Sequence, residues 1–118
     1  LFSVDERVEM LTEITKDIPR VQITTFYGLT AEFARECKAH AIIRGLRAIS
    51  DFEYEINMAT TNKKLNPDTD TVLLTPSEPY LFLSSRVVKE IAGFGGQVDH
   101  FVPPEIEARL RKKLAEQA

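Results

Sequence analysis

A short apolar run that stops abruptly at arginine constrains the fold of this chain more than any other feature. Residues 41–43 are apolar on both faces of an extended backbone, and residues 44–47 (RGLR) follow at once. Strands of this kind are typical of interior positions in a parallel sheet, where both faces are covered. The next segment, from Ser50 to about Leu65, has helical spacing and ends at an Asn-Pro-Asp stop.

The same change from strand to helix recurs along the chain. Strands are expected at residues 21–25, 41–43 and 71–74. Helices are expected from residue 4 up to the Asp17-Ile18-Pro19 stop, over residues 31–39 and 50–65, and from near Ser84 to Gly93. A last amphipathic helix is expected after Pro103-Pro104, with Ile106, Leu110 and Leu114 on one stripe. Ser3 with Glu6 and Ser50 with Glu53 have the spacing of capping boxes. Alternating elements of this kind predict an α/β fold with parallel strands, in a single domain over residues 1–118.

Composition excludes several classes of function. The formal net charge of -3 argues against broad nucleic-acid binding, which usually shows a basic surplus. No apolar run approaches the roughly 18 residues that span a bilayer. Cys37, His40 and His100 do not have metal-ligand spacing, so no metal site is predicted.

Residues 44–47 are the first candidate site. Ligands of open parallel sheets bind beyond the carboxyl ends of the strands. Gly45 permits close approach of a ligand, and Arg44 and Arg47 offer donors suited to phosphate oxygens. The alternative is that Arg47 pairs with Asp51 or Glu55 at an ordinary helix start.

Three further segments complete the predicted cleft. Asp51, Glu55 and Asn62 share a narrow arc of the following helix, as a cleft lining or as a solvated face. Residues 80–86 (YLFLSSR) follow the 71–74 strand and open a helix, whose free amides attract anions unless Ser84 is simply a cap. Residues 27–30 (YGLT) form a turn that also follows an expected strand, either as a third binding loop or as a generic turn. Together these loops predict a cleft for a phosphorylated ligand.

The stretch IIRGLRAISDFEYE resembles the signature of the bacterial phosphopantetheine adenylyltransferase family, also called pantetheine-phosphate adenylyltransferase. The resemblance extends through FYGLTAEFAR, NKKL, FLSSRVVKE and VPP, and so over essentially the whole chain. It implies a Rossmann-like dinucleotide-binding nucleotidyltransferase fold. It also implies transfer of AMP from ATP to 4′-phosphopantetheine, which gives dephospho-coenzyme A and pyrophosphate in coenzyme A biosynthesis. Further implications are magnesium with ATP, a cytoplasmic homohexamer and feedback inhibition by coenzyme A.

The resemblance also assigns residues. It implies that Arg44 holds the phosphate of phosphopantetheine, and that Leu29, Thr30 and Asn62 approach its pantetheine arm. The residues implied to bind ATP are Gly45, Leu46, Arg47, Glu55, Tyr80, Leu81, Phe82, Leu83, Ser84, Ser85 and Arg86. Family members usually carry a third serine where this chain has Arg86.

The family's nucleotide loop, with its catalytic histidine, does not occur in these residues, so no catalytic side chain is assigned within the chain. The first two strands of the family sheet are likewise expected to be absent. In a 3-2-1-4-5 strand order the remaining strands would then lie on either side of a gap. The alternative function is a non-catalytic module that binds a nucleotide or coenzyme A.

Overall fold

The computed structural model describes residues 1–117, and the side chains of residues 49 and 50 lie outside this description. The chain forms two compact units. The helical unit contains residues 1–25 together with the residues from 83 onward, and the sheet unit contains residues 26–82. The single domain expected over the whole chain stays a prediction.

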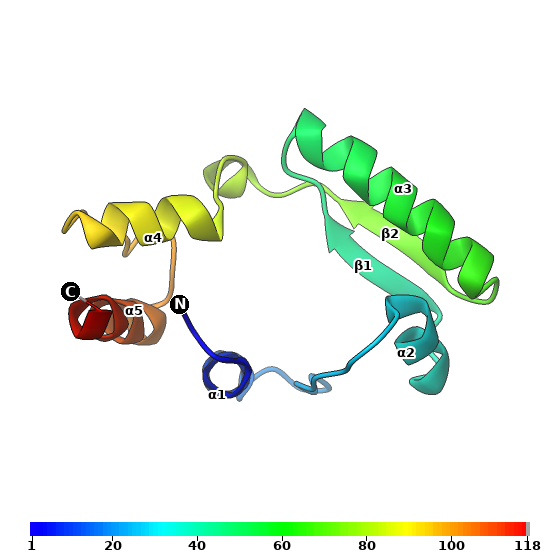
Figure 1. Cartoon of the computed structure of the whole chain (residues 1–118), viewed down its shortest axis with the longest axis horizontal. Coiled ribbons are helices and arrows are strands. Elements are labelled where there is room, and N and C mark those ends of the chain that lie inside the picture. Colours follow the sequence, from blue (N-terminus) through cyan, green and yellow to red (C-terminus); the bar gives the residue numbers. More distant parts are fainter. Residues whose placement is uncertain (118) are drawn as a thin grey trace. The chain divides into compact units, whose positions relative to one another are not determined.

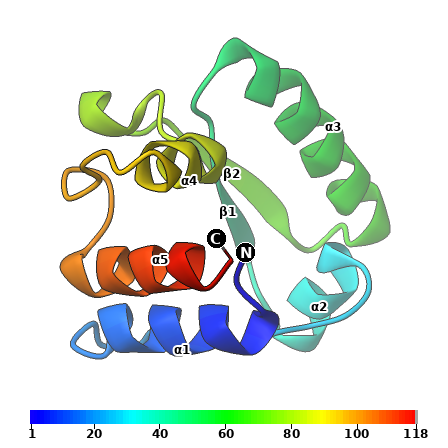
Figure 2. The same ribbon diagram turned by 60° about the vertical axis from the view of Figure 1, so that its left-hand side comes forward.

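Three helices build the helical unit: α1 (Val4–Thr15), α4 (Ser85–Gly93) and α5 (Pro104–Gln117). Its core is apolar and consists of Val88, Ala92, Val98 and Leu110. Leu114 packs against this cluster, so Leu110 and Leu114 of the stripe expected on the last helix both contribute to the core. Figure 2 shows α1 and α5 side by side.

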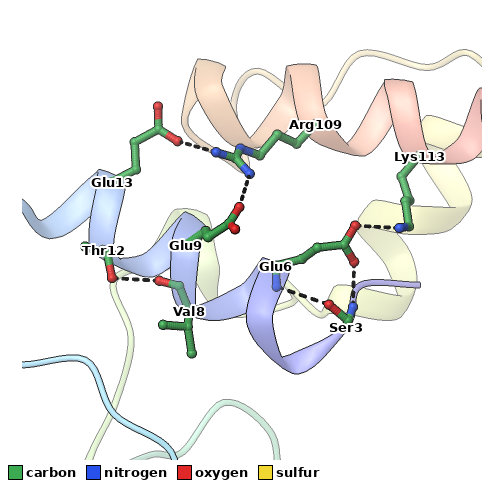
Figure 3. Close-up of polar contacts among 8 residues, drawn as sticks. All are labelled: Ser3, Glu6, Val8, Glu9, Thr12, Glu13, Arg109 and Lys113. Atoms are coloured by element: carbon green, nitrogen blue, oxygen red, sulfur yellow. Dashed lines mark hydrogen bonds and ion pairs between the residues drawn. The ribbon is translucent and has the colours of Figure 1, made fainter.

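Charged side chains connect α1 to α5 across this pair of helices (Figure 3). Arg109 donates to Glu9 over 3.3 Å and to Glu13 over 3.1 Å, and Lys113 donates to Glu6. Glu6 also completes the predicted capping box, since its carboxylate accepts from the Ser3 amide while the Ser3 hydroxyl accepts from the Glu6 amide. The hydrogen bond from Lys113 lowers the pKa of Glu6 and is matched by a raised pKa of Lys113.

The sheet unit is a parallel strand pair with two helices. β1 (Ala41–Gly45) pairs with β2 (Asp70–Leu74) in a register that places Ala41 opposite Asp70 and Gly45 opposite Leu74. α3 (Ile49–Leu65) connects the strands and contacts β2, and α2 (Thr30–Glu36) precedes β1 (Figure 1). The parallel α/β arrangement is confirmed.

Residues 41–43 form a strand as predicted, but the prediction that this strand is buried in the interior of a sheet was wrong. The strand extends to Gly45 and is mostly exposed. Ile43 is 59% exposed and its partner Val72 is 41% exposed. In the described residues the sheet has two strands, and α3 lies against it from one side. One face of each strand is therefore left uncovered.

The strand expected at residues 21–25 was also wrong. These residues are not in a strand, although their β-branched alternation favours one. A strand needs hydrogen bonds from a neighbour. Within the described part of the chain, β1 and β2 pair with each other and residues 21–25 pair with neither.

Helix boundaries differ from the expectations at two places. The helix expected over residues 31–39 ends at Glu36, because Lys38 adopts a φ of 53° and the amide of Ala39 returns to the carbonyl of Ala34. Cys37 is consequently exposed. α3 begins at Ile49 after the N-cap Ala48, and the box predicted for Ser50 and Glu53 involves a side chain outside the described residues.

The remaining elements follow the predictions. α3 ends at Leu65, with Asn66 as its C-cap, and β2 adds one residue to the expected strand. α4 begins directly after Ser84. None of the described helices combines the length and apolar character needed to cross a bilayer.

Candidate functional site

The carboxyl ends of β1 and β2 meet at one edge of the sheet unit. Gly45 lies opposite Leu74 in the parallel register, and the Leu46 amide continues the ladder with a 2.8 Å hydrogen bond to the Leu74 carbonyl. The backbone of residues 44–46 is thus hydrogen-bonded to β2 up to the point where the arginine loop, residues 44–47, leaves the sheet. Such an edge is where parallel α/β sheets bind ligands.

Arg44 is held at this edge by a bidentate ion pair with Glu55. Its Nε lies 3.0 Å from Glu55 Oε2, and its Nη2 lies 2.7 Å from Glu55 Oε1. The Glu55 side chain is 8% exposed, whereas that of Arg44 is 52% exposed. The buried carboxylate therefore fixes the fork of a guanidinium that still reaches solvent.

The pair changes the titration of both partners. The hydrogen bond from Arg44 lowers the pKa of Glu55 below its ordinary value, and burial opposes this shift. The same hydrogen bond raises the pKa of Arg44. Both groups are consequently charged throughout the physiological pH range. The edge of the sheet therefore carries the oriented cation of Arg44, paired with the buried Glu55 carboxylate.

Arg47 contacts a different carboxylate of α3. Its Nε lies 3.3 Å from Asp51 Oδ2, and its amide donates to the same oxygen over 3.4 Å. The pairing that offered an alternative explanation for Arg47 is therefore present. The Arg47 side chain is 44% exposed, so its guanidinium still reaches solvent beside this contact.

Asn62 occupies another part of α3 from the arginine loop. It is seven residues beyond Glu55, which corresponds to about 10 Å along a helix. Its carbonyl accepts the amide of Asn66 at the helix end. The structure thus brings Asp51 and Glu55, but not Asn62, into contact with the arginines.

Thr30 begins α2, and Leu29 is the N-cap of that helix. The Leu29 carbonyl accepts the amides of Glu32 and Phe33, and Gly28 has a φ of 105°, which favours glycine. This turn does not follow a strand, contrary to expectation. Thr30 lies on a different element from Arg44, and within the described residues no hydrogen bond joins the two.

The predicted nucleotide segment is divided between the two units. Tyr80 ends the 3-10 helix η1 (Glu78–Tyr80) of the sheet unit, and Leu81 and the strongly exposed Phe82 follow. Leu83, Ser84, Ser85 and Arg86 belong to the helical unit. There the Ser84 hydroxyl accepts the Val87 amide over 3.2 Å. The N-cap that offered an alternative explanation for Ser84 is therefore observed.

Two buried polar residues of the sheet unit were missed by the sequence analysis. Asn66 and Thr69 connect α3 to β2 and are 2% and 4% exposed. The sequence marked Asn66 as a helix stop, which is correct, but a polar residue beside proline normally signals an exposed turn. Their burial depends on contacts with segments 30 and 35 residues away, which local pattern does not reveal.

Among the described residues, no group of three or more histidine, cysteine, aspartate or glutamate side chains could hold a metal ion. Magnesium that accompanies a nucleotide is usually held by phosphates and water with one or two carboxylates. No residue of this chain is therefore assigned to a metal.

Comparison with known proteins agrees with this geometry. Residues 1–91 match the family model described as Cytidylyltransferase-like. A phosphopantetheine adenylyltransferase from Caldanaerobacter subterraneus subsp. tengcongensis is 54% identical over 97% of this chain and 71% of its own length. Enzymes of the same name from Nitrosomonas eutropha and Thiobacillus denitrificans are 51% and 50% identical over 98% of the chain, which covers 70% and 72% of their lengths. The chain is a nucleotidyltransferase and belongs to the phosphopantetheine adenylyltransferase family.

Proposed function

We propose that this protein transfers the adenylyl group of ATP to 4′-phosphopantetheine, and so forms dephospho-coenzyme A and pyrophosphate. The relatives named phosphopantetheine adenylyltransferase support this reaction, and the match to the cytidylyltransferase-like family supports its type. A phosphate oxygen of 4′-phosphopantetheine would attack the α-phosphorus of ATP in line. The bond from that phosphorus to the bridging oxygen would break, and pyrophosphate would leave.

The observation that carries the proposal is the fixed guanidinium of Arg44 at the carboxyl edge of β1. A guanidinium has five N–H donors, and Glu55 accepts from two of its nitrogens. The donors that remain can bind a phosphate without any change of the Arg44 rotamer. A side chain that is already oriented loses less conformational freedom when a ligand binds.

The other roles in this proposal follow the family resemblance. Leu29, Thr30 and Asn62 would bind the pantetheine arm. Gly45, Leu46, Arg47 and Glu55 would bind ATP, together with the residues of the nucleotide segment, which are Tyr80, Leu81, Phe82, Leu83, Ser84, Ser85 and Arg86. Ser84–Arg86 open α4, whose first amides are suited to an anion. Such a reaction depends mainly on positioning and charge stabilisation.

The proposal includes the surroundings of the reaction. ATP would enter with magnesium, which would add positive charge at the phosphates. The family resemblance further suggests a cytoplasmic homohexamer that coenzyme A inhibits.

Calorimetric titration of Arg44→Ala with each substrate tests the proposal. Loss of a charge-assisted contact costs about 1.5–3 kcal/mol, which is roughly tenfold to more than a hundredfold in affinity. We expect this loss for 4′-phosphopantetheine and a much smaller one for ATP. Lys64→Ala, which removes an exposed cation of α3 outside the site, should bind both ligands like the unaltered protein. Equal losses for the two substrates in Arg44→Ala would contradict the assignment.

A further inference from the structure

A buried polar network in the sheet unit joins the start of α2 to the segments on either side of the strands. The Asn66 side-chain amide donates to the Ala31 carbonyl over 3.1 Å and to Thr69 Oγ1 over 2.8 Å. Asn66 Oδ1 accepts the amide of Asp68 over 3.3 Å. Thr69 Oγ1 in turn donates to the Ala39 carbonyl over 2.9 Å. Every polar atom of the two side chains therefore has a hydrogen-bond partner within the protein.

Two of these acceptors belong to distant parts of the chain. Ala31 is completely buried in the first turn of α2, immediately after Thr30. Ala39 lies two residues before β1, which carries Arg44 near its other end. The network therefore connects the turn after α3 to both segments that precede the candidate site.

The bonding pattern suits a positioning role. A carbonyl oxygen has two lone pairs, so the Ala31 carbonyl can accept from Asn66 and still take part in the helix. Hydrogen bonds are directional, and a buried donor without a partner is costly. The network thus restricts the position of the first turn of α2. Packing of the small buried residues Ala31 and Ala34 alone would restrict that position less.

We propose that Asn66 and Thr69 are positioning residues for the pantetheine side of the site. They hold the backbone of Leu29 and Thr30 through the Ala31 carbonyl, and they do not touch the ligand. This inference rests on the proposed function, because it assumes that the Leu29–Thr30 turn binds the pantetheine arm.

The network lies near the Thr30 turn and away from residues 44–47, so its loss should affect the two segments differently. Thr69 directly precedes β2, and Asp70 pairs with Ala41 at the amino ends of the strands. Gly45 and Leu74 pair at the opposite ends, where Leu46 is bonded to Leu74. The ladder between them holds the arginine loop independently of the network. Loosening the network should therefore displace Thr30 more than residues 44–47.

Two substitutions of similar size isolate the Thr69 hydroxyl. Thr69→Val keeps the branched shape and removes the hydroxyl, whereas Thr69→Ser keeps the hydroxyl. We expect Thr69→Val to weaken 4′-phosphopantetheine binding about tenfold, as for loss of a supporting hydrogen bond, and to leave ATP affinity unchanged. Thr69→Ser should keep the affinities for 4′-phosphopantetheine and for ATP close to those of the unaltered protein. Asn66→Asp, which removes the donor to Ala31, should act like Thr69→Val.

Hydrogen exchange provides a second readout that needs no ligand. In Thr69→Val, amides in the first turn of α2 should exchange about tenfold faster, while those of α4 and α5 should keep their protection and so report that the protein is folded. Unchanged exchange in α2 would overturn the inference, as would equal loss of both ligands. If the unaltered protein binds no 4′-phosphopantetheine, the proposed function fails, while the exchange measurement still decides whether the network holds the Thr30 turn.

Discussion

The two units of this protein bury different kinds of residue. The helical unit is built around Val88, Ala92, Val98 and Leu110, with Met10 buried on α1. In the sheet unit the buried apolar residues described are Ala31 and Ala34, and they are accompanied by the buried polar residues Glu55, Asn66 and Thr69. The polar members all make directed hydrogen bonds.

This difference shows how the candidate site is organised. Apolar packing is non-directional and scales with buried area, so it stabilises the helical unit without fixing one side-chain geometry. Hydrogen bonds specify distance and angle. In the sheet unit they determine how Arg44 is oriented and where α2 begins. We therefore expect substitutions in the helical core to change mainly stability, and those in the sheet unit to change ligand binding as well.

The largest expected effect is on the helical core. Leu110→Ala removes a buried side chain, and such changes typically lower the free energy of unfolding by about 2–5 kcal/mol. Urea denaturation followed by circular dichroism measures this loss. Lys112→Ala, at an exposed position of the same helix, should leave the midpoint nearly unchanged. Equal midpoints for the two variants would contradict the core assignment.

A smaller loss is expected when the polar network is cut. Asn66→Ala removes two buried hydrogen bonds, one to the Ala31 carbonyl and one to Thr69 Oγ1, and each such bond contributes about 0.5–1.5 kcal/mol to the free energy of unfolding. The same denaturation experiment applies. Asn57→Ala, which removes an exposed side-chain amide on α3, is a suitable control. If Asn66→Ala were as stable as Asn57→Ala, the network would not contribute to the stability of the sheet unit.

The Arg44–Glu55 pair predicts a pH dependence of smaller size, because Arg44 is half exposed and solvent screens the pair. The folded-state pKa of Glu55 is lowered. The contribution of the pair is therefore complete above the unfolded glutamate pKa of about 4.3, and it is lost as the pH falls through the lower folded-state value. Glu55→Gln lacks this contribution.

Urea midpoints of the unaltered protein and of Glu55→Gln, measured from pH 7 down to pH 3, check this sign. The difference between them should shrink as the pH falls. A difference that stayed constant or grew would show that the carboxylate is not stabilised by Arg44.

The smallest effect is expected for the ion pair between α1 and α5. Lys113→Gln breaks the contact with Glu6, which is still partly open to solvent, since the two side chains are 26% and 33% exposed. The urea midpoint should fall slightly at low ionic strength, and the difference should disappear in about 1 M salt, where charges are screened within about 3 Å. Lys112→Gln serves as the matched control. A large, salt-independent loss would mean that Lys113 acts through packing.

Much of this organisation could be predicted from the sequence. Helical spacing and the Asn-Pro-Asp stop located α3, and the RGLR stretch located the carboxyl edge of β1. Local pattern failed where a contact depends on distant residues. Residues 21–25 have strand propensity but no paired neighbour, and residues 41–43 are apolar but uncovered in the described sheet. The burial of Asn66 and Thr69 likewise depends on Ala31 and Ala39.

The most direct test of the central claim is a double-mutant cycle on 4′-phosphopantetheine binding with Arg44→Ala, Glu55→Gln and the double variant. If Glu55 acts by orienting Arg44, Glu55→Gln should weaken binding in the unaltered background and have no further effect once Arg44 is absent. Calorimetric titration of the four proteins gives this coupling. Additive losses, with Glu55→Gln equally harmful in both backgrounds, would contradict the claim that the buried carboxylate serves the site through Arg44.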